Sequence, residues 1–241
     1  MIVNPIATGW EIIFQRAHGL LAVQLAHRWR KDQRPERWIE TLAAITEHDD
    51  GQEGWHARAH LNQAGSPLNF AEQDFPEEQA RRIALVSRYK SRWTALLISH
   101  HLSFLYERFR GQHATIDAFL DEQQQHQIQW RKELGYTKKE VEAAYRLLRW
   151  CDQCSLILGQ QQLPPGERAL EVEEGPDRTH HFIRQRADQS VVVEPWPFEE
   201  DDFWVEIETR ALHQLTFADD QALMQALHEA PVTLRRWQFK K

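Results

Sequence analysis

Four residues on helical faces that are otherwise apolar could together hold a metal ion: His18, His48, Asp49 and Asp152. An ionised carboxylate is costly to bury without a partner, so carboxylates that recur on core faces call for a compensating charge. A divalent ion provides that charge, and a mixture of imidazole and carboxylate suits Mn, Fe, Co, Ni, Zn or Mg. Proteins built of packed helices commonly place such sites between facing helices. These residue types therefore predict a site for one or two divalent ions, without distinguishing the metal.

Each of these residues also has a purely structural interpretation. A single histidine on an apolar face, such as His18, is more often a hydrogen-bonded core residue than a ligand. Asp49 stands close to a glycine and could belong to the end of a helix. Asp152 could pair with Arg149 or Arg16. For each residue taken alone, the structural explanation is the simpler one. That all four residues have only structural roles is less plausible than one shared metal site.

The elements that must position these residues are predicted to be helices. Apolar residues recur at three- and four-residue spacing, which places them on one helical face. Capping-box patterns open two of the helices, at Thr8 with Glu11 and at Thr137 with Glu140. The segment 54–75 has weak periodicity and predicts a long loop. The five expected helices cover residues 8–30, 35 to the His-Asp-Asp-Gly run at 48–51, 76–109, 115–134 and 137–160.

The run Leu-Pro-Pro-Gly at 163–166 ends the helical pattern. Beyond it, Val, Ile, Phe and Trp recur at period two, which is typical of strands. The expected strands lie near residues 181–186, 190–196, 203–215 and 232–239, with a short helix at 219–229. The sequence therefore predicts a mainly α protein, in which a helical domain over 1–162 carries a small antiparallel β-sheet formed by 163–241.

Charge and composition exclude some classes of partner. The chain has 241 residues and a net charge of −7, and its basic residues form no single cluster. A nucleic-acid partner would require a basic face, so none is expected. No apolar run approaches the roughly 20 residues that span a bilayer, so no membrane association is expected. The sequence does not open with a signal-peptide pattern and has only the cysteines Cys151 and Cys154, which favours a cytoplasmic location.

The order of the four candidate ligands resembles the HD-domain superfamily of metal-dependent phosphohydrolases. Three local sequences carry the resemblance: RAH at 16–18, LAAITEHDDG at 42–51 and LLRWCDQCS at 147–155. The resemblance covers residues from about 9 to 160. The whole chain also looks like an uncharacterised bacterial family of HD-like proteins. One departure is that Gln52 replaces the lysine that usually follows the His-Asp pair.

The resemblance implies an HD-like helical bundle that hydrolyses a phosphoester or nucleotide-like small molecule. The metal ligands would be His18, His48, Asp49 and Asp152. His100 or His101 could bind a second ion or stabilise developing charge, and Asp50 could act as the general base or orient a ligand. Three arginines could engage the small anionic substrate: Arg16, Arg88 and Arg92.

Two other functions fit the same residues. A di-iron oxygenase on an HD-type scaffold would need two further histidine ligands, and His60, His100, His101 and His126 are available. His56 could also join a second metal or simply face water. A non-catalytic interaction module could instead retain a vestigial site, as the missing lysine allows. An exposed edge of the C-terminal sheet could also support a homodimer.

Overall fold

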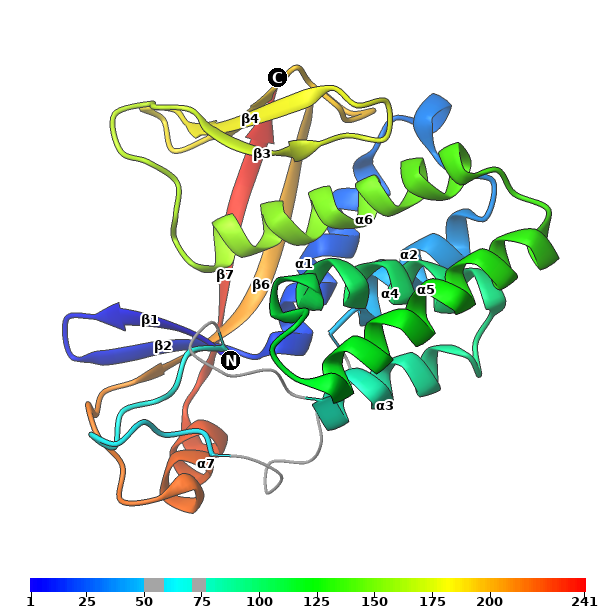
Figure 1. The fold of residues 1–241 in the computed structure, drawn as a ribbon. Helices are drawn as coiled ribbons and strands as arrows, with labels where there is room; N and C mark the ends of the chain where they lie inside the picture. The colour runs from blue at the N-terminus through cyan, green and yellow to red at the C-terminus, as the bar shows by residue number, and fades with distance from the viewer. Residues whose placement is uncertain (50–58, 71–76) are drawn as a thin grey trace.

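The computed structural model describes residues 1–49, 59–70 and 77–241 and gives them an α+β fold (Figure 1). In these parts of the chain, seven strands form one curled sheet in the order β1-β2-β6-β7-β5-β4-β3. Neighbouring strands run antiparallel except β5 and β7, which pair in parallel. The expectation of a mainly α protein, an HD-like helical bundle with a small C-terminal sheet, is therefore wrong. The sheet is a principal layer of the molecule, and helices pack beside it.

The N-terminus forms a hairpin where the sequence predicted the start of a helix. Strands β1 (Ile2–Ile6) and β2 (Gly9–Ile13) pair with each other, and β2 continues the sheet by pairing with β6. A Cβ on Gly9 would lie 2.0 Å from the carbonyl oxygen of Leu212, so only glycine allows this approach. The capping-box pattern at 8–11 is a local signal, but pairing with a strand far along the sequence decides the conformation.

The C-terminal strands and the short helix lie where they were predicted, with one strand missed. The predicted elements are β4 (His180–Gln185), β5 (Val191–Glu194), β6 (Asp202–Leu212), α7 (Asp220–Glu229) and β7 (Val232–Lys240). The missed element is β3 (Leu170–Glu174), a short edge strand in which three of five residues are glutamates. Strand β6 pairs with both β7 and β2, so it joins the C-terminal strands to the N-terminal hairpin.

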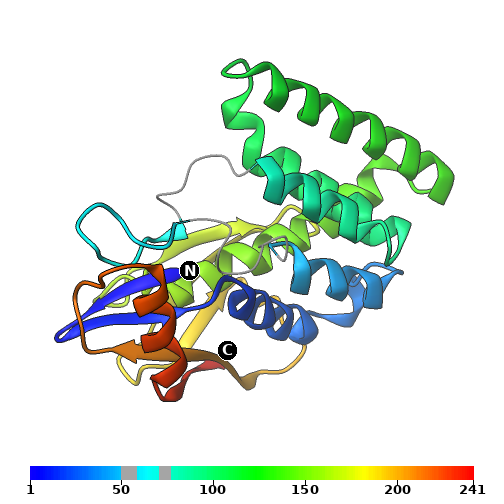
Figure 2. The same ribbon diagram turned by 90° about the horizontal axis from the view of Figure 1, so that it is seen from below.

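Six α-helices lie beside the sheet, and Figure 2 shows α3 and α5 farthest from it. Their bounds are α1 Gln15–Arg28, α2 Trp38–Glu47, α3 Glu77–Ser87, α4 Arg92–Tyr106, α5 Ala114–Leu134 and α6 Lys138–Gly159, with short 3₁₀ turns at Lys31–Gln33 and Glu107–Phe109. The single helix predicted over 76–109 is two helices, because Ser91 accepts a hydrogen bond from the Thr94 amide and caps a new start. The capping box of Thr137 and Glu140 is confirmed and opens α6.

Helix α1 is held tightly between the sheet and α2. The Gln24 side chain donates to the Glu206 carbonyl at 2.9 Å and accepts from the Glu206 amide at 3.0 Å, which ties α1 to β6. Where α1 faces α2, a Cβ on Gly19 would lie 2.3 Å from the Thr46 carbonyl oxygen. The absence of a side chain at this glycine lets α1 and α2 approach each other next to His18.

Residues from both predicted domains, 1–162 and 163–241, contribute strands to the one sheet. The division into these two domains stays a prediction about folding units. No helix in the described parts of the chain is long and apolar enough to cross a membrane.

Candidate metal centre

His18 is completely buried on α1, and both of its ring nitrogens have defined neighbours. Nδ1 lies 3.0 Å from Ser155 Oγ, which itself donates to the Asp152 carbonyl at 2.8 Å. The serine proton is therefore used, so the network assigns the Nδ1 proton to His18 and the acceptor role to Ser155. Nε2 lies 3.0 Å from Asp49 Oδ2. A lone pair cannot face a carboxylate oxygen at this distance without a proton or a cation between them.

His48 directly follows α2, and its two ring nitrogens repeat the arrangement of His18. Nδ1 lies 2.7 Å from the Ile45 carbonyl, which can only accept, so Nδ1 carries a proton. Nε2 lies 3.1 Å from Asp152 Oδ1 and 3.7 Å from Asp49 Oδ2. Metal-binding histidines usually have the same arrangement, with one nitrogen donating to a carbonyl and the other facing the ion.

His101 on α4 adds a third imidazole to this cluster. Its Nε2 lies 4.0 Å from Asp152 Oδ2, and its ring centroid lies 5.0 Å from that of His48. The three histidine side chains are at most 1% exposed, whereas the side chains of Asp49 and Asp152 are 21% and 14% exposed. The cluster therefore has a buried imidazole side and a carboxylate side that reaches solvent.

The spacing of the donor atoms fits a metal ion. Two overlapping groups, His18 with His48 and Asp152, and His48 with Asp49 and His101, each have ligand atoms within 4.8 Å of one another. Zn–N and Zn–O bonds of about 2.0–2.2 Å separate neighbouring ligand atoms by roughly 3–4 Å. Buried histidine and aspartate side chains thus lie within metal-binding distance, as the sequence predicted.

The charges of the cluster are strongly coupled. Burial disfavours the His48 imidazolium, but the carboxylates of Asp152 and Asp49 outweigh burial and raise its pKa to about 10. Burial likewise opposes ionisation of both aspartates, yet His48 holds the pKa of each below its ordinary value. Burial, together with repulsion by His48, lowers the pKa of His101 to about 4. Both aspartates are therefore ionised at neutral pH, and the protonated His48 ring balances one of the two negative charges in the protein alone.

The structure does not bring the other catalytic candidates, Asp50 and His100, into the cluster of described residues. Asp50 lies outside the described residues, as does His56. His100 is half-buried and packs on Tyr145 with ring centroids 5.5 Å apart. Burial lowers the pKa of His100 to about 4. It contributes no atom to the two groups of ligand atoms, so of the two adjacent histidines the structure brings His101, not His100, to the cluster.

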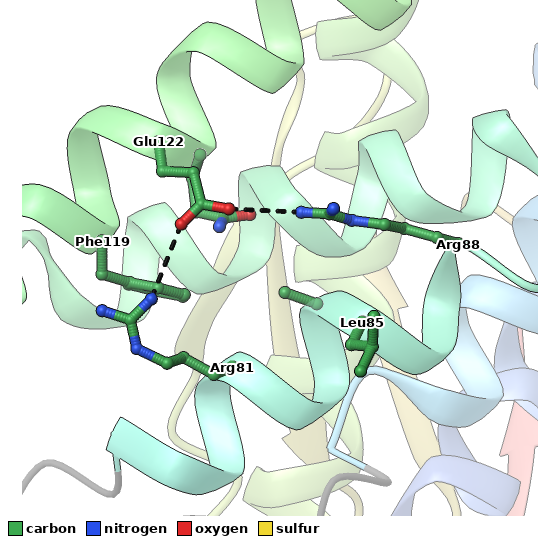
Figure 3. A pocket seen from close by; sticks show the side chains of 7 residues that line it. Arg81, Leu85, Arg88, Phe119 and Glu122 are labelled. Carbon is green, nitrogen blue, oxygen red and sulfur yellow. Dashed lines mark hydrogen bonds and ion pairs between the residues drawn. The ribbon is translucent and has the colours of Figure 1, made fainter.

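Two of the three candidate substrate-binding arginines contact α5. Arg88 pairs with Glu122 at 3.4 Å and lines a pocket of about 170 Å³ between α3 and α5, where Arg81 pairs with the same carboxylate (Figure 3). Arg92 pairs with Glu133, and both Arg88 and Arg92 lie over the ring of Trp130.

Arg16 is exposed on α1, two residues before His18. Side chains two residues apart do not share a helical face. The interactions that the structure defines for Arg88 and Arg92 lead to α5, not to the histidine and aspartate cluster.

The structure also places His60, His126 and the two cysteines. The His60 amide bonds to Asp220 of α7, and the His126 ring stacks on Trp130. Cys151 and Cys154 are free and buried on α6, where burial raises the pKa of both thiols. Both cysteines flank Asp152, as expected of small core residues.

Gln15 is a polar residue at the cluster that the sequence analysis missed. It is 5% exposed, and its Nε2 donates to Asp49 Oδ2 at 2.8 Å. Its position three residues before His18 puts both side chains on one side of α1, which was an available signal. Ser155, three residues after Asp152 on α6, was also missed, although it fixes the His18 ring through Nδ1.

Fold and site together define an α+β protein with a buried cluster of histidines and aspartates suited to a metal. The chain belongs to the DUF3891 family: residues 1–214 match the model of that family, which is described as a protein of unknown function. The chain has no significant match among curated proteins or among solved structures. The relation to HD-domain proteins stays a prediction from the sequence.

Proposed function

We propose that this protein is a metal-dependent hydrolase that acts on a phosphoester or nucleotide-like small molecule. The observation that supports it most strongly is the matched orientation of His18 and His48. In both rings Nδ1 is held by an acceptor, Ser155 Oγ or the Ile45 carbonyl, and Nε2 faces a carboxylate. A core histidine needs only to satisfy its hydrogen bonds, whereas two rings aimed at two carboxylates are the donor set of a metal site.

Each residue of the cluster has a definite role in this proposal. His18, His48, Asp49 and Asp152 would hold the ion, with His101 as a fifth donor. A bound divalent ion would lower the pKa of a water molecule and polarise a phosphoryl oxygen. Gln15 fixes the Asp49 carboxylate through its amide nitrogen. The partly exposed carboxylates mark the side from which a small anionic substrate would approach. The role of Asp50 as general base rests on the sequence resemblance.

Two observations favour the hydrolase over the alternatives. A di-iron oxygenase requires two further histidine ligands, and the described residues bring one, His101, to the cluster. A vestigial site in an interaction module would be expected to be closed, whereas Asp49 and Asp152 both reach solvent. Sites that bind and convert a substrate need such an opening.

The first prediction concerns metal content. Protein purified without chelator should carry a stoichiometric divalent metal, measured by elemental analysis. Asp49→Ala and Asp152→Ala should both lose it, because each removes a ligand and leaves fewer donors to balance the ion. The same preparations should hydrolyse p-nitrophenyl phosphate or bis(p-nitrophenyl) phosphate only when the metal is present.

Asp201→Ala is the matched control, since Asp201 is an exposed aspartate that pairs with Lys241 on the sheet side of the molecule. It should keep the metal content and activity of the unaltered protein. Metal absent from every preparation, with no thermal shift on addition of Mn²⁺ or Zn²⁺, would contradict the proposal and favour the interaction module.

A further inference from the structure

The three imidazoles of the cluster differ in how their outer nitrogens are held. Nδ1 of His18 and of His48 lies within hydrogen-bond distance of an oxygen atom. Nδ1 of His101 is buried and has no hydrogen-bond partner in the described parts of the chain. Metal-binding histidines almost always donate from the nitrogen that does not face the ion, because this bond fixes the tautomer and the orientation of the ring. His101 therefore lacks one contact that the other two histidines have.

A second buried polar atom without a partner in the described ranges belongs to Tyr145, whose ring neighbours that of His101. The hydroxyl of Tyr145 is buried and makes no hydrogen bond with the described residues. The Tyr145 ring stands on α6, seven residues before Asp152, with its centroid 6.3 Å from that of His101. The Tyr145 oxygen lies on the χ2 axis of its own ring and does not move when that ring turns, so the bond would form by rotation of the His101 ring about its soft χ2 torsion. Each atom could supply the partner that the other lacks.

We propose that the Tyr145 hydroxyl accepts a hydrogen bond from His101 Nδ1–H and so fixes His101 as a metal ligand through Nε2. Tyr145 is then a positioning residue that acts through His101. This inference rests on the metal centre of the proposed function, and it completes the same pattern for all three histidines: one nitrogen held by an oxygen, the other aimed at the carboxylates.

A merely structural role for Tyr145 predicts a different outcome. Its ring packs against the hydrophobic core, and phenylalanine would preserve that packing. Removing a buried hydroxyl that has no partner leaves stability unchanged or improves it. Tyr145→Phe is thus a substitution for which packing alone predicts no functional loss.

The test is a double-mutant cycle on metal affinity. The unaltered protein, Tyr145→Phe, His101→Ala and the double variant would be titrated with Zn²⁺ and Mn²⁺ against a chromophoric chelator. Tyr145→Phe should weaken binding by about 10- to 100-fold, as loss of an outer hydrogen-bond partner typically does. The double variant should bind no more weakly than His101→Ala, because the tyrosine acts only through that histidine.

Tyr136→Phe is the control, since the Tyr136 hydroxyl donates to Glu36 at the surface and touches no residue of the cluster. The metal-free Tyr145→Phe variant should remain folded, with a melting temperature close to that of the unaltered protein, which separates lost positioning from lost folding. If His101→Ala does not fold, His101→Gln takes its place in the cycle.

The outcomes separate this inference from the proposed function. Equal metal affinity of Tyr145→Phe and the unaltered protein, or losses that add fully to those of His101→Ala, would overturn the role of Tyr145 while leaving the metal centre intact. A protein that binds metal but hydrolyses no phosphoester would refute only the proposed activity, and the affinity cycle would still decide the role of Tyr145. A protein that binds neither ion would refute both.

Discussion

At the scale of single residues, His48 should be protonated when the cluster holds no metal and neutral when it binds one. Its raised pKa of about 10, set by burial against the attraction of Asp152 and Asp49, means that the imidazole is protonated at neutral pH in the protein alone. Metal coordination through Nε2 requires the neutral ring, and so the ion must displace this proton. The same two carboxylates attract either the proton or the ion.

Metal binding at pH 7.5 should therefore release about one proton from His48, and the apparent affinity should rise by about tenfold per pH unit below its pKa. The sign follows from a raised pKa: lowering the pH favours the protonated ring and opposes the metal. Calorimetric titration in phosphate and in Tris would measure the proton count, since the two buffers differ in ionisation enthalpy. A binding enthalpy independent of buffer, with an affinity independent of pH, would contradict this account.

The residues of the cluster were largely predictable, because histidine and aspartate on otherwise apolar helical faces call for a partner. His18, His48, Asp49 and Asp152 are polar residues on apolar helical faces, and the structure brings all four together. The choice between His100 and His101 was not predictable in the same way. On α4 almost every residue from Trp93 to Leu102 is buried, so apolar spacing cannot tell which face meets the cluster. Gln15 was missed because an amide carries no charge that demands an explanation.

At the scale of elements, the contact of α1 with α2 sets the distance between His18 and the His48–Asp49 pair. Gly19 follows His18 directly, and a Cβ there would meet the rigid backbone carbonyl of Thr46 at 2.3 Å. A backbone atom cannot move aside as a flexible side chain can, so the helices themselves would have to separate.

Gly19→Ala should destabilise the fold by about 1–3 kcal/mol, the usual cost of overpacking, and should weaken metal binding. Denaturant unfolding and chelator competition would measure the two effects. Gly159→Ala is the matched control: it is also a helical glycine, but its Cβ would meet the Ile2 Cδ1 methyl at 3.2 Å, which can yield. It should be neutral or mildly stabilising, because alanine favours helix. Equal effects of the two substitutions would show that the α1–α2 contact is not special.

The elements also show where local sequence signals failed. Residues 8–11 carry a capping-box pattern, yet 9–13 form a strand because β2 completes the sheet against β6. That pairing joins residues from opposite ends of the sequence, and no local window contains both. The break between α3 and α4 was readable in principle from Ser91, which caps α4. The sequence analysis missed this break because apolar residues keep their helical spacing from α3 into α4.

At the scale of the whole molecule, the cluster draws its side chains from α1, the end of α2, α4 and α6. The sheet holds α1 through the Gln24 bonds to β6, and α6 packs beside α1. The error in the predicted fold class therefore did not displace the cluster, since its residues stand on predicted helices or directly after one. An ion held by side chains from several elements connects those elements and stabilises the folded state in which they meet.

Saturating metal should accordingly raise the melting temperature, and Asp152→Ala should abolish the rise. At one hundred times the dissociation constant the stabilisation is about 2.7 kcal/mol. For a chain of this length, that corresponds to roughly 5–10 °C.

Thr137→Ala separates a general loss of stability from loss of the site, because Thr137 caps the end of α6 that lies far from Asp152. It should lower the melting temperature by roughly 2–4 °C, for a cap worth about 1 kcal/mol. The metal-dependent rise should remain, since the ligands are intact. Differential scanning calorimetry with and without Mn²⁺ would measure both effects. A metal-dependent rise that persists in Asp152→Ala would place the stabilising ion elsewhere on the molecule.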